Sequence, residues 1–210
     1  PEEQATDISS TFATTIYAPQ NRPDIRGLQG AVSSDHPLAT QAGLRVLQEG
    51  GNATDAIIAM AGVLAVVRPH MNGIGGDAFG IFYDGETREV TALNASGRAG
   101  ELATPEFFRS AEVSRIPGTG ALSVLYLPGG AAPEVGSLLI NEELAVSLET
   151  IAREGKAGYY NGAIGLQLAA FITEQGGHLR AGDFANHTST WVDPLRGDYL
   201  DYSFLVMPPN

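Results

Sequence analysis

The segment from residue 53 to residue 67 constrains the fold of this chain more than any other part of the sequence. It reads ATDAIIAMAGVLAVV, so apolar residues lie on almost every side of a helix. Asn52 can cap this helix, and Asp55 can stabilise the positive end of its dipole. A helix with so little polar face is stable only when it is covered on most sides. We therefore expect this helix inside the protein, packed on sheets.

Glycine clusters separate short segments whose apolar residues repeat with the period of a helix or of a strand. Residues 84–87 are typical of a hairpin turn, and Asn141 is placed to cap a helix. Residues 1–29 are polar and aperiodic, so we interpret them as an N-terminal arm. The pattern predicts helices over residues 37–48, 53–67, 142–154 and 162–174, and strands over residues 30–34, 79–83, 89–94 and 195–207.

Charge and composition exclude several classes of partner and cofactor. The 210 residues include 24 acidic and 12 basic side chains, a formal net charge of −12, and Lys156 is the one lysine. This charge disfavours nucleic acid and anionic membrane surfaces as partners. The absence of cysteine excludes disulfides, thiolate nucleophiles, iron–sulfur clusters and Cys-based zinc sites. No apolar run is long enough for a membrane span and no signal peptide is visible, which leaves bacterial cytoplasm, periplasm and secretion open.

A glycine-rich loop follows the apolar helix. Gly73, Gly75 and Gly76 come close to a dinucleotide-binding fingerprint, but that fingerprint requires the order strand, loop, helix. Here the order is helix, loop, strand, so we interpret the loop as a tight, close-packed turn that leads into a central strand.

The histidines and serines show no recognisable catalytic or metal-binding spacing. The four histidines, at positions 36, 70, 178 and 187, lack the spacing of a helical metal site, which favours structural or surface roles. No Gly-x-Ser-x-Gly nucleophile elbow occurs. We therefore expect no metal and no cofactor.

Arg98 is the lone residue of most interest. It follows a predicted strand end through the small residues Ala95, Ser96 and Gly97. There its guanidinium fork can bind a carboxylate through two parallel hydrogen bonds. An ion pair with a surface acid is an equally open interpretation.

Several motifs in the chain closely resemble the amino-terminal region of the γ-glutamyltransferase family. Each motif alone is modest, but their order and spacing together are specific. The resemblance runs from about residue 30 to residue 210, through VSSDHPLA (32–39), GGNATDA (50–56), VRPH (67–70), GIGGDAF (73–79), PGTGAL (117–122), DF (183–184), WVDPL (191–195) and MPPN (207–210).

The resemblance implies the fold of the N-terminal-nucleophile hydrolases, an α+β, four-layer αββα sandwich made as one precursor that cleaves itself into a large and a small subunit. It implies that this chain is a large-subunit portion, with the small subunit from the same precursor as partner. The nucleophile is then the N-terminal Thr of the small subunit, so no catalytic residue is expected in this chain. The implied substrate is a small γ-glutamyl or other acyl amide, whose acyl group passes to water or to an amine.

The substrate-holding residues depart from the family pattern. In the family, an Arg within a pattern like Leu-Asp-x-Arg-Glu grips the substrate α-carboxylate, and Ser96 occupies that Arg position here. Arg98 lies two residues further on, where strand alternation allows the same face. Arg98 and Ser96 are therefore the candidate substrate-binding residues. The displacement leaves open a different acyl group, as in the related cephalosporin acylases.

A second departure lies between Val124 and Leu125. After Val124 the family has a substantial helical stretch, whereas Leu125 resumes in a much later family segment, so we expect a gap between them. The family also continues well beyond Asn210, so we do not expect this chain alone to be a self-sufficient catalyst. A non-catalytic binding protein of the same fold is the alternative from another class.

Overall fold

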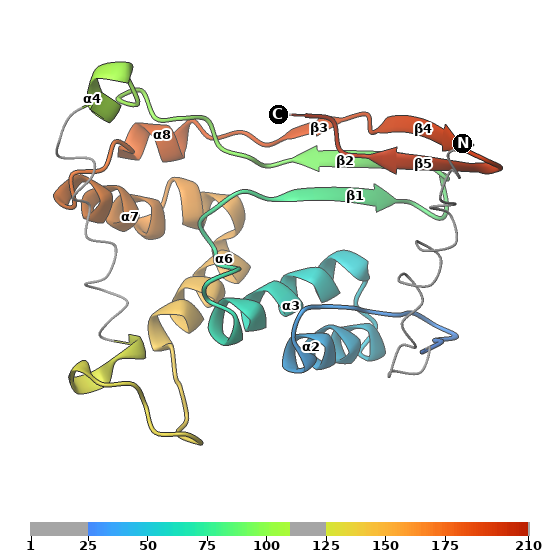
Figure 1. Ribbon diagram of the computed structural model, residues 1–210, viewed down its shortest axis with the longest axis horizontal. Helices are drawn as coiled ribbons and strands as arrows, with labels where there is room; N and C mark the ends of the chain where they lie inside the picture. The colour runs from blue at the N-terminus through green and yellow to red at the C-terminus, as the bar shows by residue number, and fades with distance from the viewer. Residues whose placement is uncertain (1–24, 110–124, 210) are drawn as a thin grey trace, which may run out of the picture. The chain divides into compact units, whose positions relative to one another are not determined.

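The structure is a computed structural model that describes residues 25–109 and 125–209. The chain divides into two compact units, Pro1–Leu64 and Ala65–Asn210, and Figure 1 traces the order of their helices and strands. Residues 1–24 of the predicted N-terminal arm lie outside the described residues.

The first unit holds α2 (Pro37–Gln48) and most of α3 (Ala53–Val67), and both predicted helices are confirmed. Each helix begins at a side-chain cap. The His36 imidazole accepts the backbone N–H two residues on at 3.2 Å. At α3, Asn52 Oδ1 accepts the N–H of Asp55 at 3.0 Å, and Asp55 Oδ2 accepts the N–H of Asn52 at 2.9 Å. These caps satisfy backbone donors that the first turn of a helix leaves open.

One side of α3 is covered by α2. Ala56 and Met60 are 1% and 8% exposed, and a Cβ placed on Gly43 of α2 would lie 2.7 Å from Met60 Cγ. On other sides, Ile57 and Ile58 are 52% and 64% exposed. Within its own unit, α3 is therefore covered on the side that faces α2, and the burial of its other sides in the whole protein stays a prediction.

The strand predicted at residues 30–34 does not form. These residues take no regular secondary structure, and neither sheet of the described residues includes them. A strand depends on hydrogen bonds to a neighbouring strand. The prediction is wrong because a short apolar run does not itself supply that neighbour.

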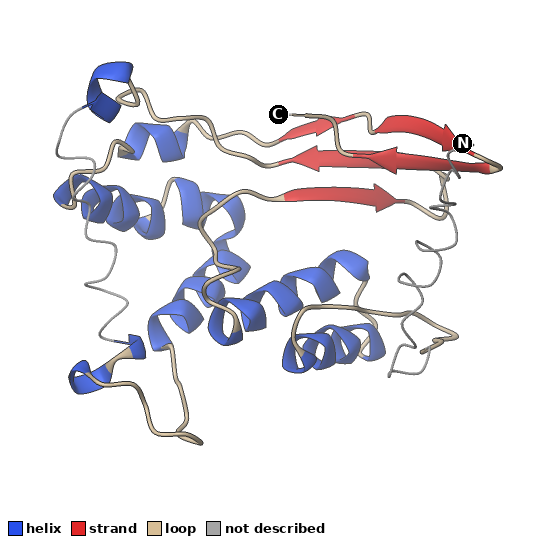
Figure 2. Ribbon diagram, in the orientation of Figure 1, coloured by secondary structure: helices blue, strands red, loops and turns tan. Residues whose placement is uncertain are grey.

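The second unit contains a three-stranded antiparallel sheet in the order β1, β2, β3 and a separate two-stranded sheet of β4 and β5 (Figure 2). β1 (Phe79–Tyr83) and β2 (Val90–Asn94) confirm the predicted hairpin. β3 (Thr190–Val192) pairs with β2, so that Trp191 lies opposite Leu93. The helix α3, the glycine loop and β1 follow one another in the predicted order.

Asp84 closes the turn between β1 and β2. Its Oδ1 accepts the N–H of Thr87 at 3.1 Å and the N–H of Glu86 at 2.7 Å. These backbone hydrogen bonds hold the pKa of Asp84 below its ordinary value. The turn predicted at residues 84–87 is therefore confirmed.

The region predicted as strand over residues 195–207 forms two strands joined by a turn. β4 (Leu195–Tyr199) and β5 (Tyr202–Val206) pair antiparallel. The chain reverses at Leu200, whose φ is 52°, and at Asp201. The alternation of apolar and polar residues identified β structure here but not the position of the reversal.

The other elements of the second unit are helical. Asn141 Oδ1 accepts the N–H of Leu144 at 3.0 Å, which confirms the predicted cap. The short helices at residues 105–109 and 181–185 were not predicted, because five residues are too few to show a helical period. The elements are α4 (Pro105–Arg109), the 3₁₀ helix η2 (Pro128–Gly130), α6 (Glu142–Tyr160), α7 (Ala163–Glu174) and α8 (Ala181–Ala185).

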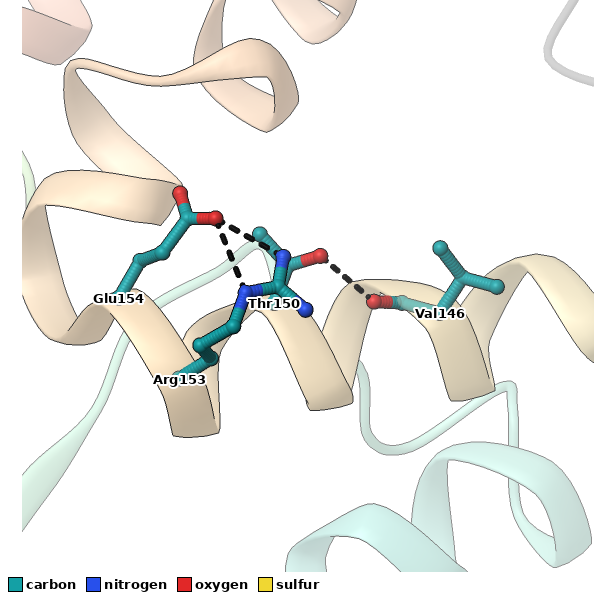
Figure 3. Close-up of polar contacts among 4 residues, drawn as sticks. All are labelled: Val146, Thr150, Arg153 and Glu154. Atoms are coloured by element: carbon teal, nitrogen blue, oxygen red, sulfur yellow. Dashed lines mark hydrogen bonds and ion pairs between the residues drawn. The ribbon is translucent and has the colours of Figure 1, made fainter.

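The helix α6 extends beyond its predicted end at residue 154. Gly155 has φ 62° and ψ −149°, a conformation that is essentially restricted to glycine, and it breaks the helix into two parts. Just before the break, Arg153 Nη2 donates to Glu154 Oε1 at 2.8 Å, and Thr150 Oγ1 donates to the carbonyl of Val146 at 2.9 Å (Figure 3). The predicted helix therefore matches the first part of α6.

The corner between α6 and α7 is closely packed around glycine. A Cβ placed on Gly165 of α7 would lie 2.6 Å from the carbonyl oxygen of Tyr159 and 2.8 Å from that of Tyr160. Backbone oxygens cannot move aside as a flexible side chain can. Only a residue without a side chain therefore lets these two helices approach this closely.

We expect Gly165→Ala to lower the free energy of unfolding by about 1–3 kcal/mol, because its methyl group must displace rigid backbone. Gly182→Ala in α8 is the matched control, since nothing lies within 4 Å of its Cβ position. That variant should be neutral or up to about 1 kcal/mol more stable. Thermal unfolding of the protein that carries this chain measures both. Equal stability of the two variants would contradict the close approach.

Candidate substrate-binding site

The segment that carries both candidate residues begins where β2 ends. The N–H of Ala95 donates to the carbonyl of Ala78 at 2.9 Å, which prolongs the β1–β2 pairing by one step. The N–H of Ser96 then turns back to Asn94 Oδ1 at 3.0 Å. This local turn ends the strand and directs the following residues away from it.

Arg98 lies exposed on this segment. Within residues 25–109 and 125–209, no side chain forms a hydrogen bond or an ion pair with its guanidinium. The interpretation of Arg98 as half of a surface ion pair therefore finds no acidic partner in the part of the chain that the structure describes. An exposed guanidinium of this kind can bind an incoming carboxylate in the bidentate geometry that arginine favours.

Ser96 lies against the glycine loop. Its Oγ donates to Asp77 Oδ1 at 3.0 Å, across 19 residues of sequence. At the other side of the loop, the hydroxyl of Tyr159 donates to the carbonyl of Ile74 at 2.8 Å. The loop from residue 73 to residue 77 is thus joined both to the candidate segment and to the second part of α6.

The close packing expected for this loop is wrong at two of its three glycines. A Cβ placed on Gly73 or on Gly76 would meet nothing within 4 Å, and one on Gly75 would lie 3.5 Å from the hydroxyl oxygen of Tyr159. None of the three has a positive φ. Neither crowding nor dihedral angle within this chain therefore requires glycine at positions 73 and 76.

Two tyrosines and a histidine form a stack beside the candidate segment. The Tyr160 ring lies parallel to the His187 imidazole, with centroids 4.8 Å apart and planes at 13°, and it meets the Tyr159 ring edge-on at 4.8 Å. A Cβ on Gly97 would lie 3.9 Å from His187 Nδ1, so the imidazole faces the segment just before Arg98. Burial raises the pKa of Tyr159 and that of Tyr160, which keeps both hydroxyls protonated to higher pH.

A second carboxylate holds the far end of the segment. Asp183 Oδ1 accepts the N–H of Glu101 at 3.1 Å, and Asp183 Oδ2 accepts the N–H of Arg180 at 2.8 Å, where α8 begins. Gly100 is buried, and a Cβ on it would lie 3.0 Å from Asp183 Oδ2 and 3.2 Å from His178 Cδ2. Glycine at position 100 lets the segment pass this close to α8.

Sequence reasoning did not identify Asp77 and Asp183 as partners of this segment. Both residues belong to motifs that resemble the γ-glutamyltransferases. Their hydrogen bonds cross 19 and 82 residues of sequence, and no local periodicity reports such contacts. The order of the motifs along the chain indicates the family, but it does not indicate that Asp77 and Asp183 form hydrogen bonds with this segment.

Other features of the described residues do not add to this site. A hollow of about 580 Å³ contains none of residues 94–101, and no group of three or more His, Asp or Glu residues is arranged to hold a metal ion in the described ranges. No helix in those ranges is long and apolar enough to cross a membrane. The hollow is lined by Leu125, Pro128, Pro133, Glu134, Ser137, Leu138, Leu139 and Ile140.

Comparison with known proteins confirms the resemblance seen in the sequence. The family described as gamma-glutamyltranspeptidase matches the chain in two pieces, residues 39–125 and 121–210. The glutathione hydrolase-like YwrD proenzyme of Bacillus subtilis is 30% identical over 246 aligned positions, which cover 88% of this chain and 46% of that protein. The chain thus spans about half the length of this curated relative.

Solved structures show the same fold. The γ-glutamyltranspeptidase of Helicobacter pylori superposes with a TM-score of 0.78 at 23% identity, covering 89% of this chain and 72% of that one. The cephalosporin acylase of Bacillus halodurans superposes with a TM-score of 0.71 at 26% identity, covering 92% of this chain and 47% of that one. These matches confirm the expected α+β fold of the N-terminal-nucleophile hydrolases.

The fold and the matched segments define a chain of the N-terminal-nucleophile hydrolase class. Within that class, the chain belongs to the gamma-glutamyltranspeptidase family, a family of enzymes. The relative from Bacillus subtilis is named as a proenzyme.

We expect Tyr159→Phe to destabilise the protein by about 0.5–1.5 kcal/mol, because it removes the hydrogen bond to the carbonyl of Ile74. Tyr160→Phe is the matched control, since it keeps the ring that stacks on His187 and removes only a hydroxyl. Denaturant unfolding of both variants measures the difference. If both lose the same stability, the Tyr159 hydroxyl does not anchor the loop.

Proposed function

We propose that this chain is the large-subunit portion of a self-processing enzyme similar to the γ-glutamyltransferases and glutathione hydrolases. It transfers a γ-glutamyl group to water or to an amine. Membership of the gamma-glutamyltranspeptidase family supports the proposal. The observation that carries it is Arg98, an exposed guanidinium on a segment that hydrogen bonds hold on both sides.

The bond chemistry lies outside this chain. The N-terminal Thr of the small subunit bonds through its Oγ to the γ-carbonyl carbon, and the amide C–N bond breaks as the amine leaves with a proton. The α-amino group of that Thr serves as the nearby base. Water or an acceptor amine then attacks the ester and restores the free Thr. Backbone N–H groups, also of the small subunit, hold the oxyanion.

The task of this chain is to position the donor. A γ-glutamyl donor carries an α-carboxylate at the end remote from the reacting amide. Arg98 binds that carboxylate with its guanidinium fork and so presents the carbonyl to the nucleophile. Ser96 lies two residues before it and holds the segment through Asp77.

We expect Arg98→Ala to lower kcat/KM for a γ-glutamyl anilide roughly 10- to 150-fold, because the lost charge-assisted contact is worth about 1.5–3 kcal/mol. Arg98→Lys should also weaken binding, since one ammonium cannot make the paired contact. Kinetics on the complete processed enzyme measure both, with an anilide donor that lacks the α-carboxylate as the control. Equal slowing of the two donors, or of neither, would exclude Arg98 as the carboxylate clamp.

An amidase for a different acyl group is the second candidate. The displaced Arg and the similarity to a cephalosporin acylase favour it. The same kinetic comparison separates the two candidates. An acylase of this kind gains nothing from the α-carboxylate, so the donor that lacks it is processed at least as well.

The hairpin of β4 and β5 supports the proposal that the small subunit covers part of this chain. Cross-strand pairs place alternate residues on the same side of a hairpin. On one side Arg196 Nη2 donates to Ser203 Oγ at 2.6 Å, and Ser203 Oγ donates to Asp198 Oδ1 at 2.6 Å. The opposite side is apolar, and its large side chains are exposed. It consists of Leu195, Gly197, Tyr199, Tyr202, Phe204 and Val206.

We expect Tyr202→Glu to weaken association of the two subunits about tenfold or more. A charge buried on the apolar side costs more than the 1.4 kcal/mol that a tenfold change requires. Leu205→Glu is the matched control, because position 205 lies opposite Arg196 on the polar side. Co-purification of the two fragments of the processed protein measures association. If both variants keep the small subunit equally well, the apolar side is not its docking surface.

We also propose that this chain lacks a segment that its relatives have between residues 124 and 125. Val124 lies outside the described residues. Two findings support the proposal. The family match splits into pieces that meet at residues 121–125, and the alignment to the Bacillus subtilis relative extends over 246 positions although this chain has 210 residues.

A further inference from the structure

We propose that Asp77 is a positioning residue for Arg98, acting through Ser96, and that it thereby tunes the selectivity for donors that carry a carboxylate. This inference rests on the proposed function, since it assigns to Asp77 a part in the same substrate site. It also gives a role to Asp77, the last residue of the glycine loop. Packing within this chain does not explain the glycines at positions 73 and 76 of that loop.

The first observation is that two carboxylates fix the span from Ser96 to Glu101. Asp77 Oδ1 accepts the Ser96 hydroxyl at 3.0 Å, and Asp183 Oδ1 accepts the Glu101 N–H at 3.1 Å. Hydrogen bonds to an ionised carboxylate are about twice as strong as neutral ones. Arg98 therefore projects from a short span whose two ends are held.

The second observation is that Asp77 binds the hydroxyl of Ser96 and not the guanidinium of Arg98. In the described ranges, no ion pair joins the carboxylate of Asp77 to Arg98, although Ser96 lies only two residues before Arg98. The carboxylate is engaged by a hydroxyl. The guanidinium therefore keeps its hydrogen-bond donors for a ligand, as a carboxylate clamp requires.

The third observation is that the loop before Asp77 is anchored. Asp77 ends a loop whose residue Ile74 accepts the hydroxyl of Tyr159, on the second part of α6. On the other side of the segment, the His187 ring faces Gly97 and stacks on Tyr160. A guanidinium attached to so constrained a span loses less conformational freedom when it binds, so a loosened span costs affinity without altering the bond chemistry.

The test measures KM and kcat separately on the complete processed enzyme. The variants are Asp77→Ala, Asp77→Asn and Ser96→Ala, each alone and combined with Arg98→Ala. The donors are a γ-glutamyl anilide and a matched anilide without the α-carboxylate. Asp77→Asn is the conservative control, because an amide oxygen can still accept the Ser96 hydroxyl.

We expect Asp77→Ala and Ser96→Ala to raise KM for the γ-glutamyl donor roughly 5- to 20-fold, less than the loss from Arg98→Ala, with little change in kcat. The donor without the carboxylate should change less than about twofold, and Asp77→Asn should restore most of the loss. In the Arg98→Ala background, Asp77→Ala should add almost nothing, because the group that it positions is gone.

The inference is overturned if Asp77→Ala affects both donors equally, or if its effect persists undiminished without Arg98. Should Asp77→Ala fail to fold, Ser96→Ala removes the same hydrogen bond from its other partner, which is half-buried, and decides the question. The two proposals fail differently. If Arg98→Ala loses the preference for the donor with the α-carboxylate but Asp77→Ala and Ser96→Ala keep it, only the positioning role is refuted. If Arg98→Ala keeps that preference, the carboxylate clamp itself is refuted.

Discussion

The antiparallel pairing of β1 with β2 is the constraint on which the candidate site depends. The pairing places the start of β1 beside the end of β2, and the bond between Ala95 and Ala78 carries it one step further. The glycine loop that enters β1 and the segment that leaves β2 therefore emerge side by side (Figure 1). Asp77 and Ser96 can meet only because this pairing brings their backbones together.

Each further contact of the site restricts one more degree of freedom of the same segment. The Tyr159 hydroxyl fixes the loop, the His187 ring limits the space beside Gly97, and Asp183 holds the N–H of Glu101. The contacts come from α6, from α8 and from the chain that follows α8. The site is thus a product of tertiary structure, and Arg98 is an exposed cation on the segment that these contacts hold.

The sequence predicted the helices and the β1–β2 hairpin well because each has a local cause. Asn52, Asn141 and Asp84 cap or close their elements through contacts within three residues. The prediction failed where a distant partner decides the outcome, as at residues 30–34, which no strand joins. Ser96 and Arg98 were predicted as a pair, but the carboxylates that hold their segment were not, because those bonds are long-range.

The polar side of the β4–β5 hairpin has a consequence for the order of folding. Its hydrogen bonds join residues at most seven positions apart, so the chain closes only a short loop to form them. The β2–β3 pairing, by contrast, brings Ala92 to Val192 and must close a far longer loop, at a larger cost in entropy. On loop length alone, we expect the β4–β5 hairpin to close earlier in folding than the pairing of β2 with β3.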